Sequence, residues 1–277
     1  MRWMGTVASI GSLCGFVSGF FDKPVDDRAI LEKILTEAPR RLSSKSLTDA
    51  PKLRGQLHRQ FATFMLPQAR SLQYPEQSLY AKAKSGVLVL GGIYKCSNCS
   101  DWHVSCAGGF ILTADGKAVT NYHVIAQAAM KAFVALDAEG QVYDVSAVLA
   151  ADKSNDVAII QLKLPTGKRL SPMPVAQRAE PGETVYVISH PDANFYMLTK
   201  GVVARYAQKG QTTWMCITAE YAKGSSGGPV LNEKGQVVGM VANTKSIYYT
   251  DDNGKQENLQ MVIRNCVPSA SILKLIR

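Results

Sequence analysis

The sequence predicts a mostly β fold, a β-barrel or a sandwich, preceded by a small helical segment. After Tyr80 the chain becomes a series of short apolar or alternating runs, which is typical of many short strands. Glycine-containing pairs separate several of these runs, and glycine adopts the positive φ that tight hairpins demand. Before Tyr80, apolar residues recur instead at three- and four-residue spacing among charged residues, as they do on one face of a helix.

The helical pattern extends from residue 26 to about residue 70. Its apolar positions are Ile30, Leu31, Ile34, Leu35, Leu57, Phe61 and Phe64. Pro39 and the serine-rich stretch before Pro51 are expected to divide it into two helices, and an extended connector is expected from Pro67 to Pro75.

Strands are then predicted at residues 87–93, 109–112, 133–136, 157–162, 185–188, 202–206, 214–218 and 237–241. The pairs expected to form turns are Asp115-Gly116, Glu139-Gly140, Lys234-Gly235 and Asn253-Gly254. A last short helix is expected at about residues 268–275.

Length and composition agree with one packed β-rich domain plus a smaller attachment. The chain has 277 residues, of which 46% are hydrophobic and 19% charged, so a wholly disordered chain is excluded. The formal charge is +9, but no tight basic run or recognition helix accompanies it, and we expect a solvated basic surface and no nucleic-acid partner. Residues 40–54 hold some of the excess, and any electrostatic partner is expected to dock there.

An apolar run from Trp3 to Phe21 follows Arg2 and carries no charge before Asp22, which is typical of a secretory signal or a membrane anchor. We therefore expect an exported protein, periplasmic or secreted, with membrane attachment through residues 3–21 as the alternative. The large Leu13 before Cys14 argues against lipidation. The expected division is a signal or anchor at 1–25, a helical segment at 26–80 and the main domain at 81–277. The helical segment's role as a propeptide, a lid or an assembly arm stays open.

The most specific motif is the stretch at residues 224–230, which reads Gly-Ser-Ser-Gly-Gly-Pro-Val. Hydrolysis of a peptide bond needs a nucleophile beside backbone N–H groups that can bind an oxyanion, and glycines leave such a backbone open to substrate. Ser226 is the predicted nucleophile. Gly224, Ser225 and Ser226 are the predicted oxyanion hole, with the N–H groups of Gly224 and Ser226 as the donors. The alternative is an ordinary glycine and serine loop.

A serine hydroxyl needs a base to take its proton, and the base needs a carboxylate to orient it. His123 is the predicted base because an apolar strand leads to it. Asp156 is the predicted carboxylate because it directly precedes the apolar run at 157–162, with Asp152 as a nearby competitor. His190, which is followed by Pro191, is expected to shape a loop instead.

The blocks at 119–125, 154–162 and 224–230, in the order His, Asp, Ser, resemble those of trypsin-like serine peptidases, nearest to the bacterial Deg/HtrA kind. The resemblance spans roughly residues 85–275. It implies a chymotrypsin fold of two six-stranded β-barrels with the triad in the cleft between them. It also implies a serine endopeptidase that forms an acyl-enzyme on protein or peptide substrates, without a metal or organic cofactor. The alternative function is a catalytically inactive binding or scaffold protein of the same fold.

Three departures from the family pattern matter. Ser225 stands where animal trypsins have an aspartate that captures a new N-terminus, so activation of that kind is not expected. Ala242 stands where digestive enzymes have a serine that bonds the catalytic aspartate, so support for Asp156 is expected from elsewhere. No sequence follows Arg277 in which to place a PDZ domain, and we expect none.

The residues that would determine substrate specificity are assigned only by their positions relative to Ser226 in the family pattern. Glu220 falls near the base of the primary pocket in trypsin-like enzymes, which predicts a basic P1 residue; in the alternative, Glu220 points to solvent or pairs with Lys223. Tyr221 is a candidate to plug that pocket. Ala242 and Asn243 complete the predicted substrate-binding set.

The segment formed by Cys96, Cys99, His103 and Cys106 has the ligand types of a tetrahedral zinc site, but its spacing is not that of a standard zinc finger. Neighbouring thiols of an exported protein more often oxidise. We therefore expect a disulfide such as Cys96–Cys99 and no metal, with zinc and free thiols as the alternatives. Cys106 is also a candidate for the pocket wall, and Cys216 and Cys266 are a further pair that can bond if they lie close enough.

Overall fold

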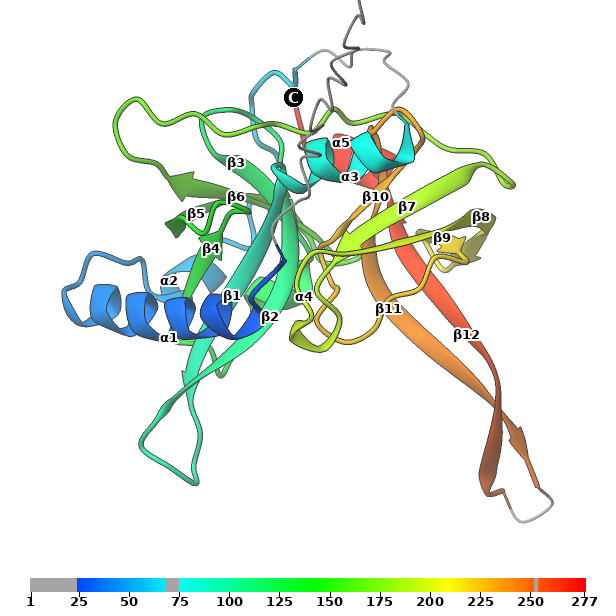
Figure 1. Cartoon of the computed structure of the whole chain (residues 1–277), viewed down its shortest axis with the longest axis horizontal. Helices are drawn as coiled ribbons and strands as arrows, with labels where there is room; N and C mark the ends of the chain where they lie inside the picture. The colour runs from blue at the N-terminus through cyan, green and yellow to red at the C-terminus, as the bar shows by residue number, and fades with distance from the viewer. Residues whose placement is uncertain (1–23, 68–74, 252–253) are drawn as a thin grey trace, which may run out of the picture.

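The computed structural model describes residues 24–67, 75–251 and 254–277 of the chain. These residues form two closed antiparallel barrels, each of six strands, which lie side by side (Figure 1). The strands of the first barrel are β1 (Val87–Lys95), β2 (Trp102–Ile111), β3 (Lys117–Thr120), β4 (Ala132–Leu136), β5 (Val142–Asp152) and β6 (Val157–Lys163). Those of the second are β7 (Thr184–Ser189), β8 (Met197–Lys209), β9 (Thr212–Ile217), β10 (Pro229–Leu231), β11 (Val237–Thr250) and β12 (Gln256–Pro268). The predicted double barrel is confirmed.

Short helices surround the barrels. They are α1 (Asp27–Ser43), α2 (Ala50–Arg54), α3 (Glu76–Lys84), α4 (Tyr122–Ala126), α5 (Ser269–Leu273) and the 3₁₀ turn η1 (Pro191–Ala193). In the part of the chain that is described, no helix combines the length and apolar character needed to cross a bilayer. The predicted signal or anchor at residues 1–25 lies outside the described residues, except for its last two.

Strand β1 is buried on both faces over most of its length, because one face points into the first barrel and α1 covers the other. Seven of its nine residues are buried. A Cβ atom at Gly91 would lie 2.7 Å from Cγ2 of Ile34, so only glycine lets the helix approach this strand so closely. Ile34 and Ala38 are fully buried in this contact. The N-terminal helix therefore contributes directly to the core of the first barrel.

Pro39 does not end the first helix as predicted. It lies inside α1, which continues to Ser43. A proline removes one helical hydrogen bond, and the packing of Ala38 and an ion pair beyond the proline offset this loss. That ion pair joins Nη1 of Arg41 to Oδ1 of Asp144 on β5 at 2.7 Å.

The predicted second helix through Leu57, Phe61 and Phe64 is wrong. The helix lies earlier, at α2, where Asp49 caps its first turn by accepting the N–H of Lys52. The chain that follows is bonded to two other segments instead: Arg59 accepts the N–H of Ala151 at the end of β5. Ala62 donates to the carbonyl of Leu275 and accepts from Arg277. These hydrogen bonds occupy backbone N–H and C=O groups that would otherwise bond to one another within a helix.

Several basic residues of the N-terminal segment are structural. Besides the Arg41 pair, the guanidinium of Arg54 donates to the carbonyl oxygens of Gln127 and Met130, at 3.0 and 3.2 Å. These contacts hold the segment on the first barrel.

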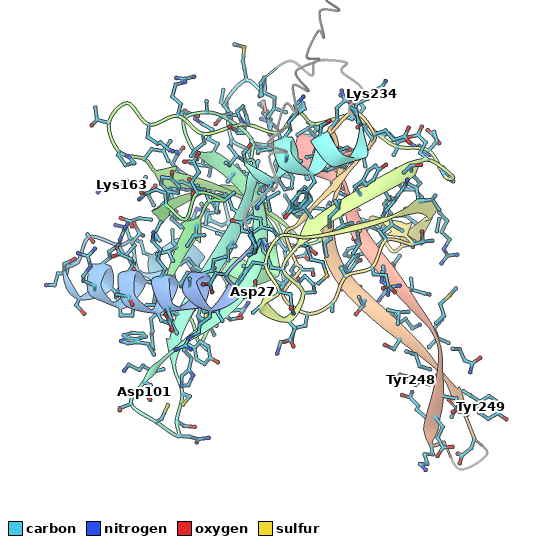
Figure 2. All side chains as sticks on the ribbon, viewed as in Figure 1. Asp27, Asp101, Lys163, Lys234, Tyr248 and Tyr249 are labelled. Carbon is cyan, nitrogen blue, oxygen red and sulfur yellow. The ribbon has the colours of Figure 1, made fainter. Side chains whose placement is uncertain are left out.

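All eight predicted strand segments coincide with strands or overlap them, whereas β5, β10 and β12 were not predicted. The outer parts of β11 and β12 extend beyond the second barrel as a long hairpin (Figure 1). Most residues in the outer parts of β11 and β12 are exposed. The sequence of these parts therefore lacks the alternation of apolar and polar residues by which a half-buried strand is predicted. Figure 2 shows Tyr248 and Tyr249 near the end of this hairpin.

Candidate active site

The three residues predicted as a triad come from three separate segments at the junction of the barrels. His123 lies in α4, directly after β3, and Asp156 lies in the turn between β5 and β6. Ser226 precedes β10 of the second barrel. His123 and Ser226 line a cleft of about 600 Å³ between the barrels.

The imidazole of His123 contacts both partners. Its Nδ1 lies 2.8 and 3.1 Å from the two carboxylate oxygens of Asp156, and its Nε2 lies 3.1 Å from Oγ of Ser226. A carboxylate only accepts hydrogen bonds, so it fixes the proton of the neutral ring on Nδ1. The lone pair of Nε2 then faces the serine hydroxyl. This is the geometry that removal of the hydroxyl proton requires.

Backbone groups supply the support for Asp156 that the sequence led us to expect from elsewhere. The N–H of His123 donates to Oδ1 of Asp156 at 2.9 Å, and the side chain of Asn121 donates to the Asp156 carbonyl at 3.1 Å. Asp156 has a φ of 56°, a left-handed conformation that aspartate and asparagine tolerate better than most residues. The turn thereby directs the carboxylate at the histidine.

Ala242 takes a different role from the serine it replaces in digestive enzymes. Its carbonyl oxygen lies 3.2 Å from Oγ of Ser226. The serine hydroxyl therefore has two acceptors within reach, the imidazole of His123 and this carbonyl.

The carboxylate of Asp152, the other candidate for orienting His123, bonds to residues of the turn that follows it. It accepts hydrogen bonds from the N–H groups of Ser154 and Asn155 and from the Asn155 side chain, at 2.8, 3.0 and 2.6 Å. These bonds use the acceptor capacity of the Asp152 carboxylate within the turn.

Gly224 and Ser226, whose N–H groups are the predicted oxyanion donors, both line the cleft. The carbonyl of Lys223 accepts the N–H of Asp192 at 2.7 Å. Because a trans peptide places its C=O and N–H on opposite sides, the N–H of Gly224 points the other way. Within the described residues, the N–H groups of Gly224 and Ser226 have no hydrogen-bond partner. They are therefore available to bind an oxyanion.

Ser225 was included in the predicted oxyanion-hole segment but not as a donor, and its N–H is engaged elsewhere. Its N–H donates to the carbonyl of Ala222 at 3.1 Å and closes a tight turn. Gly224 occupies the third position of this turn with a φ of 94°, where glycine is favoured. A Cβ at Gly224 would also lie 2.5 Å from the carbonyl oxygen of His190.

The glycine after the nucleophile brings the two barrels together. A Cβ at Gly227 would lie 2.0 Å from the carbonyl oxygen of Gly108 on β2, and the N–H of Gly108 donates to the carbonyl of Ser226 at 2.6 Å. The hydroxyl of Thr120 donates to that same Gly108 carbonyl at 2.8 Å. Sequence reasoning had linked these glycines to substrate access and had missed this inter-barrel contact.

His190 has a structural role, consistent with the expectation that it shapes a loop. It is fully buried; its Nε2 lies 3.0 Å from the carbonyl of Leu88 in the first barrel, and its Nδ1 accepts the N–H of Tyr196 at 3.1 Å. The ring is thus neutral with its proton on Nε2. Burial lowers the pKa of His190 from 6.5 to about 4.

We expect the folded protein to lose stability in mild acid because of His190. The pKa is lower in the folded state, so between pH 6.5 and about 4 the unfolded chain binds a proton that the folded chain does not. The contribution is complete above pH 6.5 and falls by roughly 3 kcal/mol as the pH approaches 4. Urea unfolding of wild type and His190→Gln across this range measures it, with exposed His58→Gln as the control. Equal pH dependence in wild type and His190→Gln would contradict the assignment.

Glu220 and Tyr221 do not take the positions that a pocket for a basic side chain would need. The carboxylate of Glu220 is 78% exposed and pairs with Nη2 of Arg264 at 3.0 Å. Tyr221 is buried in the second barrel, where its hydroxyl donates to the carbonyls of Asn243 and Asn265. The strand register directs these side chains, and the sequence does not determine it.

The cleft wall contains residues that sequence reasoning did not assign to the site. They include Leu31, Leu35, Tyr94, Trp102, Asp192 and Lys223. Leu31 and Leu35 belong to α1, so the N-terminal segment forms part of this wall. Their helical spacing had indicated only a buried face.

The described cysteines, Cys96, Cys99, Cys106, Cys216 and Cys266, are all free thiols. The expected Cys96–Cys99 disulfide is not formed, and the two Sγ atoms lie 3.2 Å apart. The Cys99 thiol stabilises the Cys96 thiolate by hydrogen bonding and lowers the pKa of Cys96 to about 7. His103 joins this pair, with its Nε2 at 3.0 Å from Sγ of Cys99. Cys106 lines the cleft, as the alternative for that residue predicted.

Known proteins resemble the central part of the chain. Residues 107–240 match the family described as trypsin-like peptidase domain. Over 145 residues the chain is 32% identical to a probable periplasmic serine endoprotease, DegP-like, of Pseudomonas putida, covering 49% of this chain and 28% of that protein. Over 139 residues it is 30% identical to the anti-sigma-I factor RsgI9 of Acetivibrio thermocellus, covering 50% of this chain and 19% of that protein. The chain thus spans less than a third of either relative's length.

A solved structure shares the fold. It is an HtrA-type protease with a tripeptide, and it matches with a TM-score of 0.56 at 17% sequence identity. The match covers 73% of this chain and 62% of the other.

Proposed function

This chain contains a trypsin-like peptidase domain that is homologous to the HtrA and Deg proteases, and from this we propose that it is a serine endopeptidase. The proposal assigns Ser226 as nucleophile, His123 as general base and acid, and Asp156 as the carboxylate that orients the imidazole. Its substrates are polypeptides, which bind in the cleft between the barrels.

The reaction forms an acyl-enzyme. Oγ of Ser226 bonds to the scissile carbonyl carbon while Nε2 of His123 takes the hydroxyl proton, and the carbonyl oxygen becomes an oxyanion. The N–H groups of Gly224 and Ser226 bind that oxyanion. His123 then gives its proton to the amide nitrogen, the C–N bond breaks, and the new amine leaves.

Water completes the cycle. His123 removes a proton from a water molecule, whose oxygen bonds to the acyl carbon. The ester bond to Oγ then breaks, and Ser226 recovers its proton from His123. Asp156 accepts the Nδ1 proton of His123 in a hydrogen bond throughout, and it stabilises the imidazolium that forms in each half of the reaction.

The observation that best supports this proposal is the 3.1 Å contact between Nε2 of His123 and Oγ of Ser226, beside the N–H groups of two cleft-lining residues that have no hydrogen-bond partner within the described part of the chain. A serine in an ordinary loop would have no oriented base. A scaffold protein would have no need for both features in one place.

A fluorophosphonate probe tests the assignment directly, because it bonds covalently only to an activated serine hydroxyl. We expect one adduct per chain, located by mass spectrometry on the peptide that contains Ser226. The adduct should be absent from Ser226→Ala and unchanged in Ser44→Ala, which alters an exposed serine of the N-terminal segment. An unlabelled wild-type chain would favour the alternative of an inactive binding protein.

A further inference from the structure

The hairpin that joins β1 to β2 carries a cluster of metal-binding side chains outside the proposed triad. Sγ of Cys96 lies 3.2 Å from Sγ of Cys99, and Sγ of Cys99 lies 3.0 Å from Nε2 of His103. All three donor atoms lie within 4.8 Å of one another. Figure 2 shows where this hairpin end lies, next to the labelled Asp101.

The hairpin end is also held in shape by contacts other than those among the three donor atoms. Nζ of Lys95 donates to the carbonyl of Ser100 and lies 4.7 Å from the ring centre of Trp102. The ring of Tyr94 packs on His103, with the ring centres 5.4 Å apart. The imidazole is therefore oriented by its neighbour on the paired strand, where Tyr94 lies opposite His103.

Cys106 does not belong to the cluster, although its spacing in the sequence suggested that it did. Side chains alternate between the two faces of a strand, so Cys106 lies on the opposite face of β2 from His103. It packs against the apolar core with Trp102 and Val104. Burial raises the pKa of Cys106 to about 12.

The three donors have the chemistry that zinc selects. Zinc takes thiolate sulfur at about 2.3 Å and imidazole nitrogen at about 2.0–2.1 Å in tetrahedral geometry. That geometry places two sulfur ligands about 3.8 Å apart, and a sulfur and a nitrogen about 3.6 Å apart. The observed Cys96–Cys99 and Cys99–His103 separations are shorter by about 0.6 Å, so a small rotation of exposed side chains opens the site.

We propose that Cys96, Cys99 and His103 form a zinc site, with Sγ, Sγ and Nε2 as ligands and solvent in the fourth position. The metal replaces the thiol protons on binding, and both protons pass to solvent. Because Tyr94, Trp102 and His103 also line the cleft that contains His123 and Ser226, a bound ion stiffens one wall of this cleft. The ion takes no part in the proposed hydrolysis.

Metal content of the full chain tests this proposal. The Ser226→Ala variant serves as the parent, so that self-cleavage cannot interfere. The reduced protein is given equimolar zinc sulfate under anaerobic conditions and desalted, and its zinc is measured by mass spectrometry. We expect about one zinc ion per chain, and none after Cys96 and Cys99 are both replaced by serine. His103→Ala should weaken binding by more than about 100-fold, because even residues outside the ligand shell lower metal affinity by about 10–100-fold.

The matched control is Cys106→Ala, which removes the fourth residue of the sequence motif and should retain zinc at the level of the parent. Cobalt provides a second readout, since thiolate ligation gives it a charge-transfer absorption that should disappear in the double serine variant. Failure of the reduced parent to retain zinc would overturn the proposal, as would equal retention by the double variant. A Cys96–Cys99 disulfide that withstands reductant would also overturn it. None of these results depends on whether the chain hydrolyses peptides.

Discussion

Replacing Ser226 by alanine is expected to lower kcat/KM for peptide hydrolysis by about 10⁶-fold, because loss of the nucleophile alone has an effect of that order in serine peptidases. This corresponds to about 8 kcal/mol of transition-state stabilisation. The side chain is small and half-buried, and among the described residues its hydroxyl bonds only to His123 and Ala242, so the fold should be retained. Casein and fluorogenic peptides provide the measurement, and sequencing of the fragments also identifies the P1 residue.

Far-UV circular dichroism and thermal unfolding of Ser226→Ala should match those of wild type. A variant that keeps more than about 1% of the wild-type rate would rule out Ser226 as the nucleophile, since the oxyanion hole and substrate binding alone leave far less activity than that. Fragments with Arg or Lys at P1 would restore a role for Glu220, which the ion pair with Arg264 now argues against.

Replacing Asp156 by asparagine is expected to lower kcat by about 10⁴-fold. An asparagine keeps the left-handed backbone conformation at this position, so the change removes the charge with little strain. The amide has only one acceptor oxygen, whereas the carboxylate now accepts both the backbone N–H and the imidazole Nδ1 of His123. The neutral ring can then place its proton on Nε2, where it blocks proton transfer from Ser226.

The matched control is Asp152→Asn, the same chemical change four residues earlier. Within the part of the chain that the structure describes, the carboxylate of Asp152 accepts hydrogen bonds only from its own turn, so we expect a modest loss of stability and a rate within a few-fold of wild type. Steady-state kinetics of both variants at pH 7 make the comparison. A larger loss of activity in Asp152→Asn than in Asp156→Asn would show that the orienting carboxylate is misassigned.

The three candidate catalytic residues could be predicted from the sequence, because catalysis needs particular side-chain types and these types are visible in the sequence. The Gly-Ser-Ser-Gly-Gly motif pointed to a serine nucleophile, and a serine needs a base and an orienting carboxylate; the apolar runs beside His123 and Asp156 indicated which residues these are. The structure brings these three side chains together. The short apolar strands were predictable for the same reason, because burial on a period of two is visible in the residues themselves.

Features that depend on backbone direction were not predictable. The direction in which Glu220 points depends on strand register. The apolar residues Leu57, Phe61 and Phe64 follow a helical spacing, yet the surrounding backbone pairs with β5 and with the C-terminal residues. In each case a distant segment decides the outcome.

The contact between Gly108 and Gly227 joins the two barrels at the point where the proposed active site is assembled from both. The first barrel holds the base and the carboxylate, and the second holds the nucleophile and the oxyanion donors, so each alone is chemically inert. The backbone at the seam is packed too closely for a Cβ atom at either glycine. A side chain at either glycine would therefore require the two barrels to move apart at this contact.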